Sequence, residues 1–112
     1  MNIKIQSLGG VKVLHCDGSL DADTVEAFKE VSYKLINEGT NNFVIDCTEV
    51  QFVDSIGLGA LISLLRRVRE KEGDVKISSL NEDVKTIFEI TRLHRLFEIS
   101  ADWKTAAKSF NR

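Results

Sequence analysis

The chain has 112 residues, of which 43% are hydrophobic and 29% charged, which fits one globular domain with a core of its own. Its formal net charge of −2 argues against a nucleic-acid partner, because such proteins carry a clear basic patch. No stretch approaches the roughly 20 apolar residues of a transmembrane helix, and the N-terminus lacks the apolar run of a signal peptide. We therefore expect a cytoplasmic protein without a membrane partner.

The first third of the chain predicts a hairpin followed by a helix. Apolar residues alternate over 3–8 and 11–16, and Gly9-Gly10 between them is typical of a tight turn. Asp21 or Asp23 is placed to cap the next helix, and Gly39 is placed to end it. The apolar stripe of that helix has helical spacing and comprises Val25, Phe28, Val31, Leu35 and Ile36.

The remaining chain continues the alternation of strands and helices. A central strand is predicted over 43–47, a helix from Ser55 to about Lys71 closed by Gly73, and a strand over 75–80. A helix capped by Asn81, a short strand over 96–99 and a final helix over 103–110 follow. This order predicts a single α/β domain over residues 1–112, with a mixed β-sheet of about five strands and about four α-helices.

The two cysteines, Cys16 and Cys47, lie inside apolar runs without metal-ligand spacing. We interpret them as small buried hydrophobic residues. A disulfide between them is possible but not required. No cofactor and no metal site is predicted, since Asp46 and Asp54 alone do not make a magnesium site.

The segment around Ser55 departs from what a core helix requires. Gly57 and Gly59 lie in its first turns, where each costs about 1 kcal/mol relative to alanine. They indicate close approach of another backbone or of a partner. Ser55 itself is placed as an N-cap. At 100° per residue, Ile56 falls opposite the core face, so an exposed isoleucine beside Ser55 is expected.

That opposite face is predicted to be shared by Ala60, Ser63 and Arg67, while the core face carries Leu58, Leu61, Ile62, Leu65 and Val68, with Leu64 at its edge. A helix N-terminus also accepts a phosphate well, because its N–H groups are free and its dipole is positive there. Phosphate on Ser55 would add roughly −1.5 to −2 charges beside Asp54, which a partner packed on this turn would have to bury.

The obvious catalytic templates do not match. The nucleophile elbow requires a glycine two residues before the serine, where this chain has Val53, and no P-loop lysine follows Gly57 or Gly59. His15 and His94 have no context that marks either as a base. We therefore do not expect an enzyme, and a small serine hydrolase is the least favoured hypothesis.

These residues resemble the STAS family, the anti-sigma-factor antagonists and their relatives. The family pattern D-S-x-G-L-G after an apolar strand matches Asp54-Ser55-Ile56-Gly57-Leu58-Gly59, and G-x-[IL]-D matches Gly18-Ser19-Leu20-Asp21. The resemblance covers essentially the whole chain, because the apolar pattern of Val84, Phe88, Leu93, Leu96, Phe97 and Ile99 also matches. The residue after the serine is often small in this family, and Ile56 departs from that.

The resemblance implies an anti-sigma factor antagonist. In such proteins the serine is phosphorylated by an anti-sigma factor that is a serine kinase, the unphosphorylated form binds that kinase, and a PP2C-type phosphatase removes the phosphate. Carried over, Ser55 is the phosphoacceptor, and Ile56 affects which kinase docks. The partner-binding residues expected on this basis are Asp21, Asp54, Ser55, Ile56, Gly57, Gly59 and Ser63.

A second hypothesis keeps the fold and changes the role. STAS domains also serve as scaffolds or sensory modules in larger complexes, and a fold does not fix a function. The sequence leaves this alternative open, without the Ser55 switch.

Overall fold

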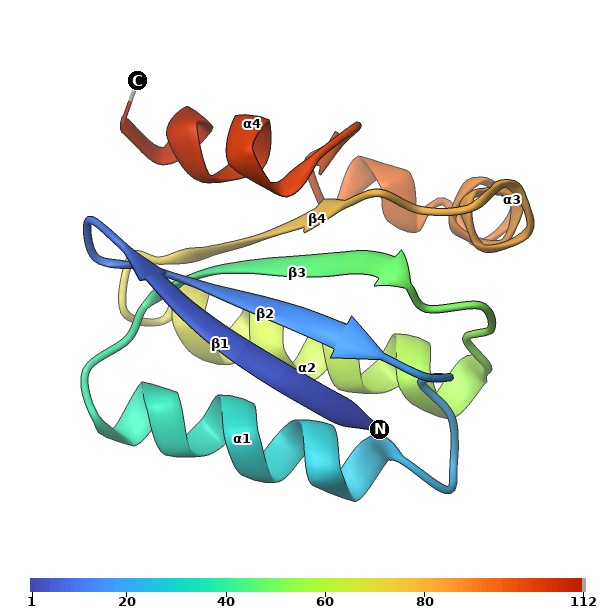
Figure 1. Cartoon of the computed structure of the whole chain (residues 1–112), viewed down its shortest axis with the longest axis horizontal. Coiled ribbons are helices and arrows are strands. Elements are labelled where there is room, and N and C mark those ends of the chain that lie inside the picture. Colours follow the sequence, from blue (N-terminus) through green and yellow to red (C-terminus); the bar gives the residue numbers. More distant parts are fainter. Residues whose placement is uncertain (112) are drawn as a thin grey trace.

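A five-stranded sheet separates two layers of helices in the computed structural model, which describes residues 1–111 (Figure 1). The sheet has the order β1-β2-β3-β4-β5; β1 is antiparallel to β2, and all other neighbours are parallel. This confirms the predicted mixed sheet and α/β class. The elements in chain order are β1 (Asn2–Leu8), β2 (Val11–Asp17), α1 (Val25–Asn37), β3 (Asn42–Glu49), α2 (Ser55–Arg69), β4 (Asp74–Ser78), α3 (Glu82–Ile90), η1 (Leu93–Arg95), β5 (Ile99–Ser100), α4 (Trp103–Lys108) and η2 (Ser109–Asn111).

The turns lie where the glycines predict them. Gly9 and Gly10 both have positive φ, 53° and 86°, which gives the two-residue turn that matches strand twist in hairpins. Gly39 follows α1 with φ 102°, as expected of a glycine that ends a helix. Asn81 accepts a hydrogen bond from Val84 N at 2.8 Å, so its predicted cap on α3 is confirmed.

The central strands are buried on both faces, and each face builds a separate core. Leu14 of β2 and Ile45 of β3 face the layer that holds α1 and α2. Val13 and Val44 face α4 on the other side, where they pack with Ala106 and Ala107. Figure 1 shows α4 on one side of the sheet and α1 with α2 on the other. The final helix therefore covers the second face of the sheet.

Three local expectations were wrong. Leu96 and Phe97 follow the 3-10 turn η1 rather than forming a strand, and β5 is only Ile99–Ser100. Asp21 does not cap α1 itself, whose N-cap is Thr24; it organises the turn before the helix. α2 ends at Arg69, before the predicted end at about Lys71 and four residues before Gly73, and a Cβ on Gly73 would lie 1.9 Å from the Asn41 carbonyl oxygen. Close backbone packing explains that glycine.

No helix formed by residues 1–111 combines the length and the apolar character needed to cross a membrane.

Candidate functional site

Ser55 lies at the end of the sheet where the parallel strands finish, and the loop after β3 leads into it. That loop is hydrogen-bonded to the loop after β2: Leu20 N donates to Phe52 O at 2.9 Å, and Asp54 N donates to Leu20 O at 3.2 Å. A bridge between Leu20 and Val53 extends the parallel pairing for one residue beyond the strands. The predicted site therefore rests on two mutually braced loops.

Asp54, not Ser55, is the N-cap of α2. Its Oδ1 accepts from Gly57 N at 2.8 Å, and its Oδ2 accepts from Ala22 N at 3.1 Å across the loop. A carboxylate has two oxygens and can offer one to each donor on either side, whereas a hydroxyl has a single oxygen. The prediction that Ser55 caps the helix is wrong by one residue, and Ser55 is the first helical residue.

The side chain of Ser55 is exposed. Within residues 1–111 its hydroxyl makes no hydrogen bond, because Asp54 already satisfies the donors that a capping serine would serve. The backbone N–H groups of the first helical turn point out of the N-terminal end of α2, where Ser55 lies. The hydroxyl is thus accessible and uncommitted, beside a helix end with partial positive charge.

Two exposed apolar side chains flank Ser55. Phe52 is 50% exposed and Ile56 is 49% exposed, and both are large. Exposure of Ile56 is confirmed as predicted. An exposed aromatic and an exposed isoleucine therefore stand on either side of Ser55 in the chain, and exposed apolar side chains of this kind are ones that protein partners use.

The two glycines of the motif have different environments. A Cβ on Gly57 would lie 2.2 Å from the Leu20 carbonyl oxygen, so the close approach predicted there is made by this chain's own backbone. A Cβ on Gly59 would meet nothing within 4 Å, and Gly59 is exposed. Only Gly59 therefore leaves open space on the surface of the helix.

The exposed face of α2 beyond its first turn is narrower than the sequence predicts. Ala60 is only 3% exposed and Ser63 is half-buried, because α1 packs alongside α2 and widens its buried face. Leu64 is fully buried, and Arg67 remains exposed with its guanidinium 4.1 Å from the Tyr33 ring centroid. The accessible part of the predicted site is its first turn.

Asp21 lies in the loop that contacts Asp54. Its Oδ1 accepts from Asp23 N at 3.0 Å and from Thr24 N at 3.2 Å, which fixes the turn before α1. The hydrogen bond from Ala22 to Asp54 brings this turn against the residue that precedes Ser55. Asp21 therefore lies at the same edge of the domain as Ser55.

Comparison with known proteins identifies the family of this chain. The STAS domain model matches residues 2–106. This chain belongs to the STAS domain family. It is 29% identical to the anti-sigma-B factor antagonist of Staphylococcus epidermidis over 83 residues, covering 74% of this chain and 77% of that protein.

Solved structures of other proteins show the same fold. A crystal structure of a putative anti-sigma factor antagonist from Thermotoga maritima matches with a TM-score of 0.93 and 22% identity, covering 98% of this chain and 95% of that one. The Bacillus cell fate determinant SpoIIAA in its phosphorylated form matches with a TM-score of 0.74 and 15% identity, covering 96% and 99%.

A second polar cluster in this STAS domain lies on the face of the sheet that α4 covers, away from α1 and α2. His15 Nδ1 lies 2.7 Å from Asp46 Oδ2, and His15 Nε2 lies 2.9 Å from Gln6 Oε1. Thr48 Oγ1 donates to Asp46 Oδ1 at 2.7 Å, and the His15 ring meets the Trp103 ring edge-on. A hollow of about 390 Å³ beside α4 is bordered by His15, Asp46, Thr48 and Trp103.

The sequence reading missed this cluster. The available signal was a polar residue inside each of two apolar strands, which the parallel register places opposite each other. Neither histidine bonds to Ser55: His94 Nδ1 lies 3.2 Å from Phe88 O. Residues 1–111 contain no group of three or more histidine, cysteine or acidic side chains suited to a metal ion.

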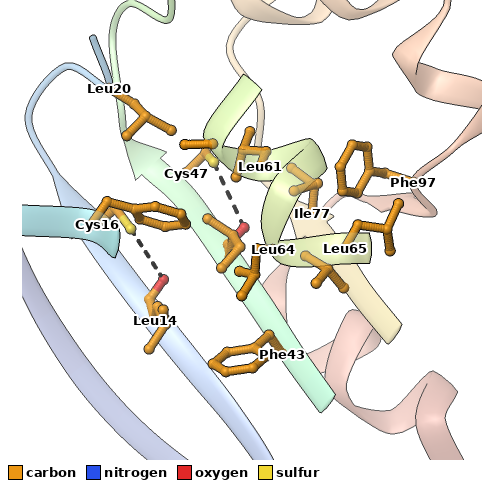
Figure 2. Packing of buried hydrophobic residues seen from close by; sticks show 14 of the residues in the cluster. Leu14, Cys16, Leu20, Phe43, Cys47, Leu61, Leu64, Leu65, Ile77 and Phe97 are labelled. Atoms are coloured by element: carbon orange, nitrogen blue, oxygen red, sulfur yellow. Dashed lines mark hydrogen bonds between the residues drawn. The ribbon is translucent and has the colours of Figure 1, made fainter. Parts of the chain in front are cut away.

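Cys16 and Cys47 are free thiols buried in the core between the sheet and the layer of α1 and α2, as Figure 2 shows. Each Sγ lies 3.7 Å from a carbonyl oxygen of its own strand, Leu14 O and Ile45 O. Burial, together with the Asp46 carboxylate, raises the pKa of Cys16 to about 12. Burial also raises the pKa of Cys47 well above its ordinary value. Both are the small buried hydrophobic residues that the sequence predicted.

Proposed function

We propose that this STAS domain is an anti-sigma factor antagonist in the cytoplasm whose binding is controlled by phosphorylation of Ser55. In its unmodified form it binds an anti-sigma factor that is a serine kinase. The kinase transfers phosphate to Ser55 Oγ and the complex dissociates; a PP2C-type phosphatase hydrolyses the phosphate and restores binding. The names of its relatives and the match to the Ser55 motif support this role.

The observation that carries the proposal is the uncommitted hydroxyl of Ser55 between exposed Phe52 and Ile56. A kinase must bring its ATP phosphate in line with the acceptor oxygen, so the acceptor has to be accessible. The flanking side chains offer the apolar area that holds a partner over the same turn. Asp21, Gly59 and Ser63 are proposed contacts at the border of this area.

Phosphate at this position would change binding with little change of fold. Asp54 holds the start of α2 through Gly57 and Ala22, so the helix end does not depend on the Ser55 hydroxyl. The added charge of roughly −1.5 to −2 would have to be buried beneath any partner that covers Phe52 and Ile56. Burying an unpaired charge is costly, so the partner should dissociate.

A binding role also fits the absence of a base at Ser55. The imidazole of His15 is occupied by Asp46 and Gln6 on the far face of the sheet, and that of His94 lies beside Phe88. A serine hydrolase needs a base within hydrogen-bond reach of its nucleophile. We therefore propose a phosphoacceptor rather than a nucleophilic catalyst.

The test is incubation with candidate anti-sigma factor kinases and Mg-ATP, followed by intact and peptide mass measurement. We expect one phosphate, mapped to Ser55, and none in Ser55→Ala. Ser7→Ala, which removes an exposed serine from β1, is the matched control and should be phosphorylated like the wild type.

Binding measurements complete the test. Ser55→Ala should bind the kinase like the wild type, and Ser55→Asp should bind at least about tenfold more weakly. Equal binding by these two variants would refute the switch. A stable complex without phosphate transfer would favour the alternative, a STAS scaffold or sensory module within a larger assembly.

A further inference from the structure

The two edges of the sheet are built differently. β5 at one edge is only two residues long, Ile99–Ser100, and offers little backbone for pairing. β1 at the other edge has seven residues that pair with β2 without a bulge, and every residue after Ile3 is exposed. Proteins usually protect a free edge with short strands, proline, bulges or several charges. β1 has none of these devices except the single charge of Lys4.

The turn geometry tells which backbone groups of β1 are unpaired. Leu8 and Val11 flank a two-residue turn, so they form a hydrogen-bonded pair. Because such pairs alternate along an antiparallel ladder, the even-numbered residues of β1 direct N–H and C=O toward β2. Ile3, Ile5 and Ser7 direct theirs outward, and nothing within residues 1–111 pairs with them.

The side chains of this edge are matched to a second copy in antiparallel orientation. With a two-fold axis at Ile5, each Ile5 faces its counterpart, Ile3 faces Ser7, and Lys4 faces Gln6. No two charges of like sign face each other in this register. Ile5 is 49% exposed, and its counterpart would cover it on the face that carries α1.

We propose that β1 pairs with β1 of a second copy, so that one sheet runs through a two-fold symmetric homodimer. The outward N–H and C=O groups of Ile3, Ile5 and Ser7 form the ladder, and the Ile5 pair forms its apolar centre. Such β-edge addition uses backbone bonds for affinity and side chains for register.

This interface is separate from the Ser55 site. In the sheet order, β2 and β3 lie between β1 and β4, and Ser55 follows the end of β3. The dimer would leave the first turn of α2 uncovered for a kinase. Failure of the phosphorylation test would thus leave the dimer untouched, and the reverse also holds.

Sedimentation velocity over a range of concentrations tests the dimer with two matched variants. Ile5→Lys places like charges face to face at the axis and should weaken dimerisation at least about tenfold. Ile90→Lys makes the same change at an isoleucine of α3 that is 75% exposed and should leave it unaltered. A monomer at every concentration, or a dimer indifferent to Ile5→Lys, would overturn the proposal.

Cysteine crosslinking checks the register. In Ile5→Cys the two new thiols belong to a hydrogen-bonded pair with Cα atoms about 5.5 Å apart, within disulfide range. In Ser7→Cys they lie about 14 Å apart, because four residues along the strand (about 13 Å) and about 5 Å between the strands separate them. Mild oxidation should link the first variant only, since Cys16 and Cys47 are buried. Equal crosslinking of both variants would contradict self-pairing. So would protection of the outward Ile3, Ile5 and Ser7 amides from hydrogen exchange that appears only when the kinase is added.

Discussion

The His15–Asp46 cluster and the Ser55 turn behave in the opposite way from what their residue types suggest. His15 and Asp46 are common catalytic types, yet they are bound to each other, and Asp46 is only 6% exposed. Ser55 is chemically ordinary, yet its hydroxyl is exposed and makes no bond within residues 1–111. Availability distinguishes the two regions more than intrinsic reactivity does. A group whose hydrogen bonds are satisfied in the fold stabilises it, whereas a group left without them is free for a partner.

The largest effect on stability is expected at Gly57, because this glycine packs against the chain's own backbone, whereas Gly59 of the same motif lies on the surface. Gly57→Ala pushes a methyl group into the Leu20 carbonyl and should lower the free energy of unfolding by about 3 kcal/mol. Gly59→Ala, two residues on, meets open space and should raise it by up to about 1 kcal/mol. Urea unfolding of both variants measures the difference, and similar losses would contradict the environments described.

Asp46→Ala should come next, because it removes the acceptor shared by His15, Thr48 and Ser78. The hydroxyl of Ser78, fully buried, would lose its partner, and we expect a loss of about 2 kcal/mol. Asp17→Ala, at an exposed aspartate of the same face, is the control and should change stability by less than about 0.5 kcal/mol. Ser55 phosphorylation should persist in Asp46→Ala at temperatures where it remains folded.

Asp54→Ala tests a residue that holds the start of α2 and also adjoins the acceptor Ser55. Loss of the cap and of the bond from Ala22 should cost about 1.5 kcal/mol. Asp54→Asn keeps an acceptor oxygen and should cost less. If both variants were as stable as the wild type while phosphorylation was lost, Asp54 would act on the kinase and not on the helix.

The sequence could predict what depends on local chemistry. The hairpin turn, the cap at Asn81 and the exposure of Ile56 all follow from neighbours within a few residues, and all three were confirmed. The burial of Ala60 depends on where α1 packs against α2, which helical periodicity does not report.

The register between strands limits what the sequence can predict in a similar way. His15 meets Asp46 only because β2 and β3 pair with a particular offset, and 31 positions separate them in the chain. The identity of the N-cap was ambiguous for another reason: Asp54 and Ser55 are both good caps, and the second bond to Ala22 favours the aspartate. That long-range bond is invisible in the sequence.

The smallest effect on stability is expected at Ser55. Ser55→Ala removes an exposed hydroxyl without a bond, so the free energy of unfolding should change by less than about 0.5 kcal/mol. Ser55→Cys then tests accessibility directly by alkylation at pH 8. A thiol exposed at a helix N-terminus is substantially ionised there, whereas Cys16, with its pKa at about 12, is almost entirely protonated. The new thiol should react at least about 1000-fold faster than Cys16 or Cys47, and that ratio should collapse in denaturant. A slow Ser55→Cys thiol in the folded protein would mean that this turn is covered, and a kinase could not reach Ser55 in that state.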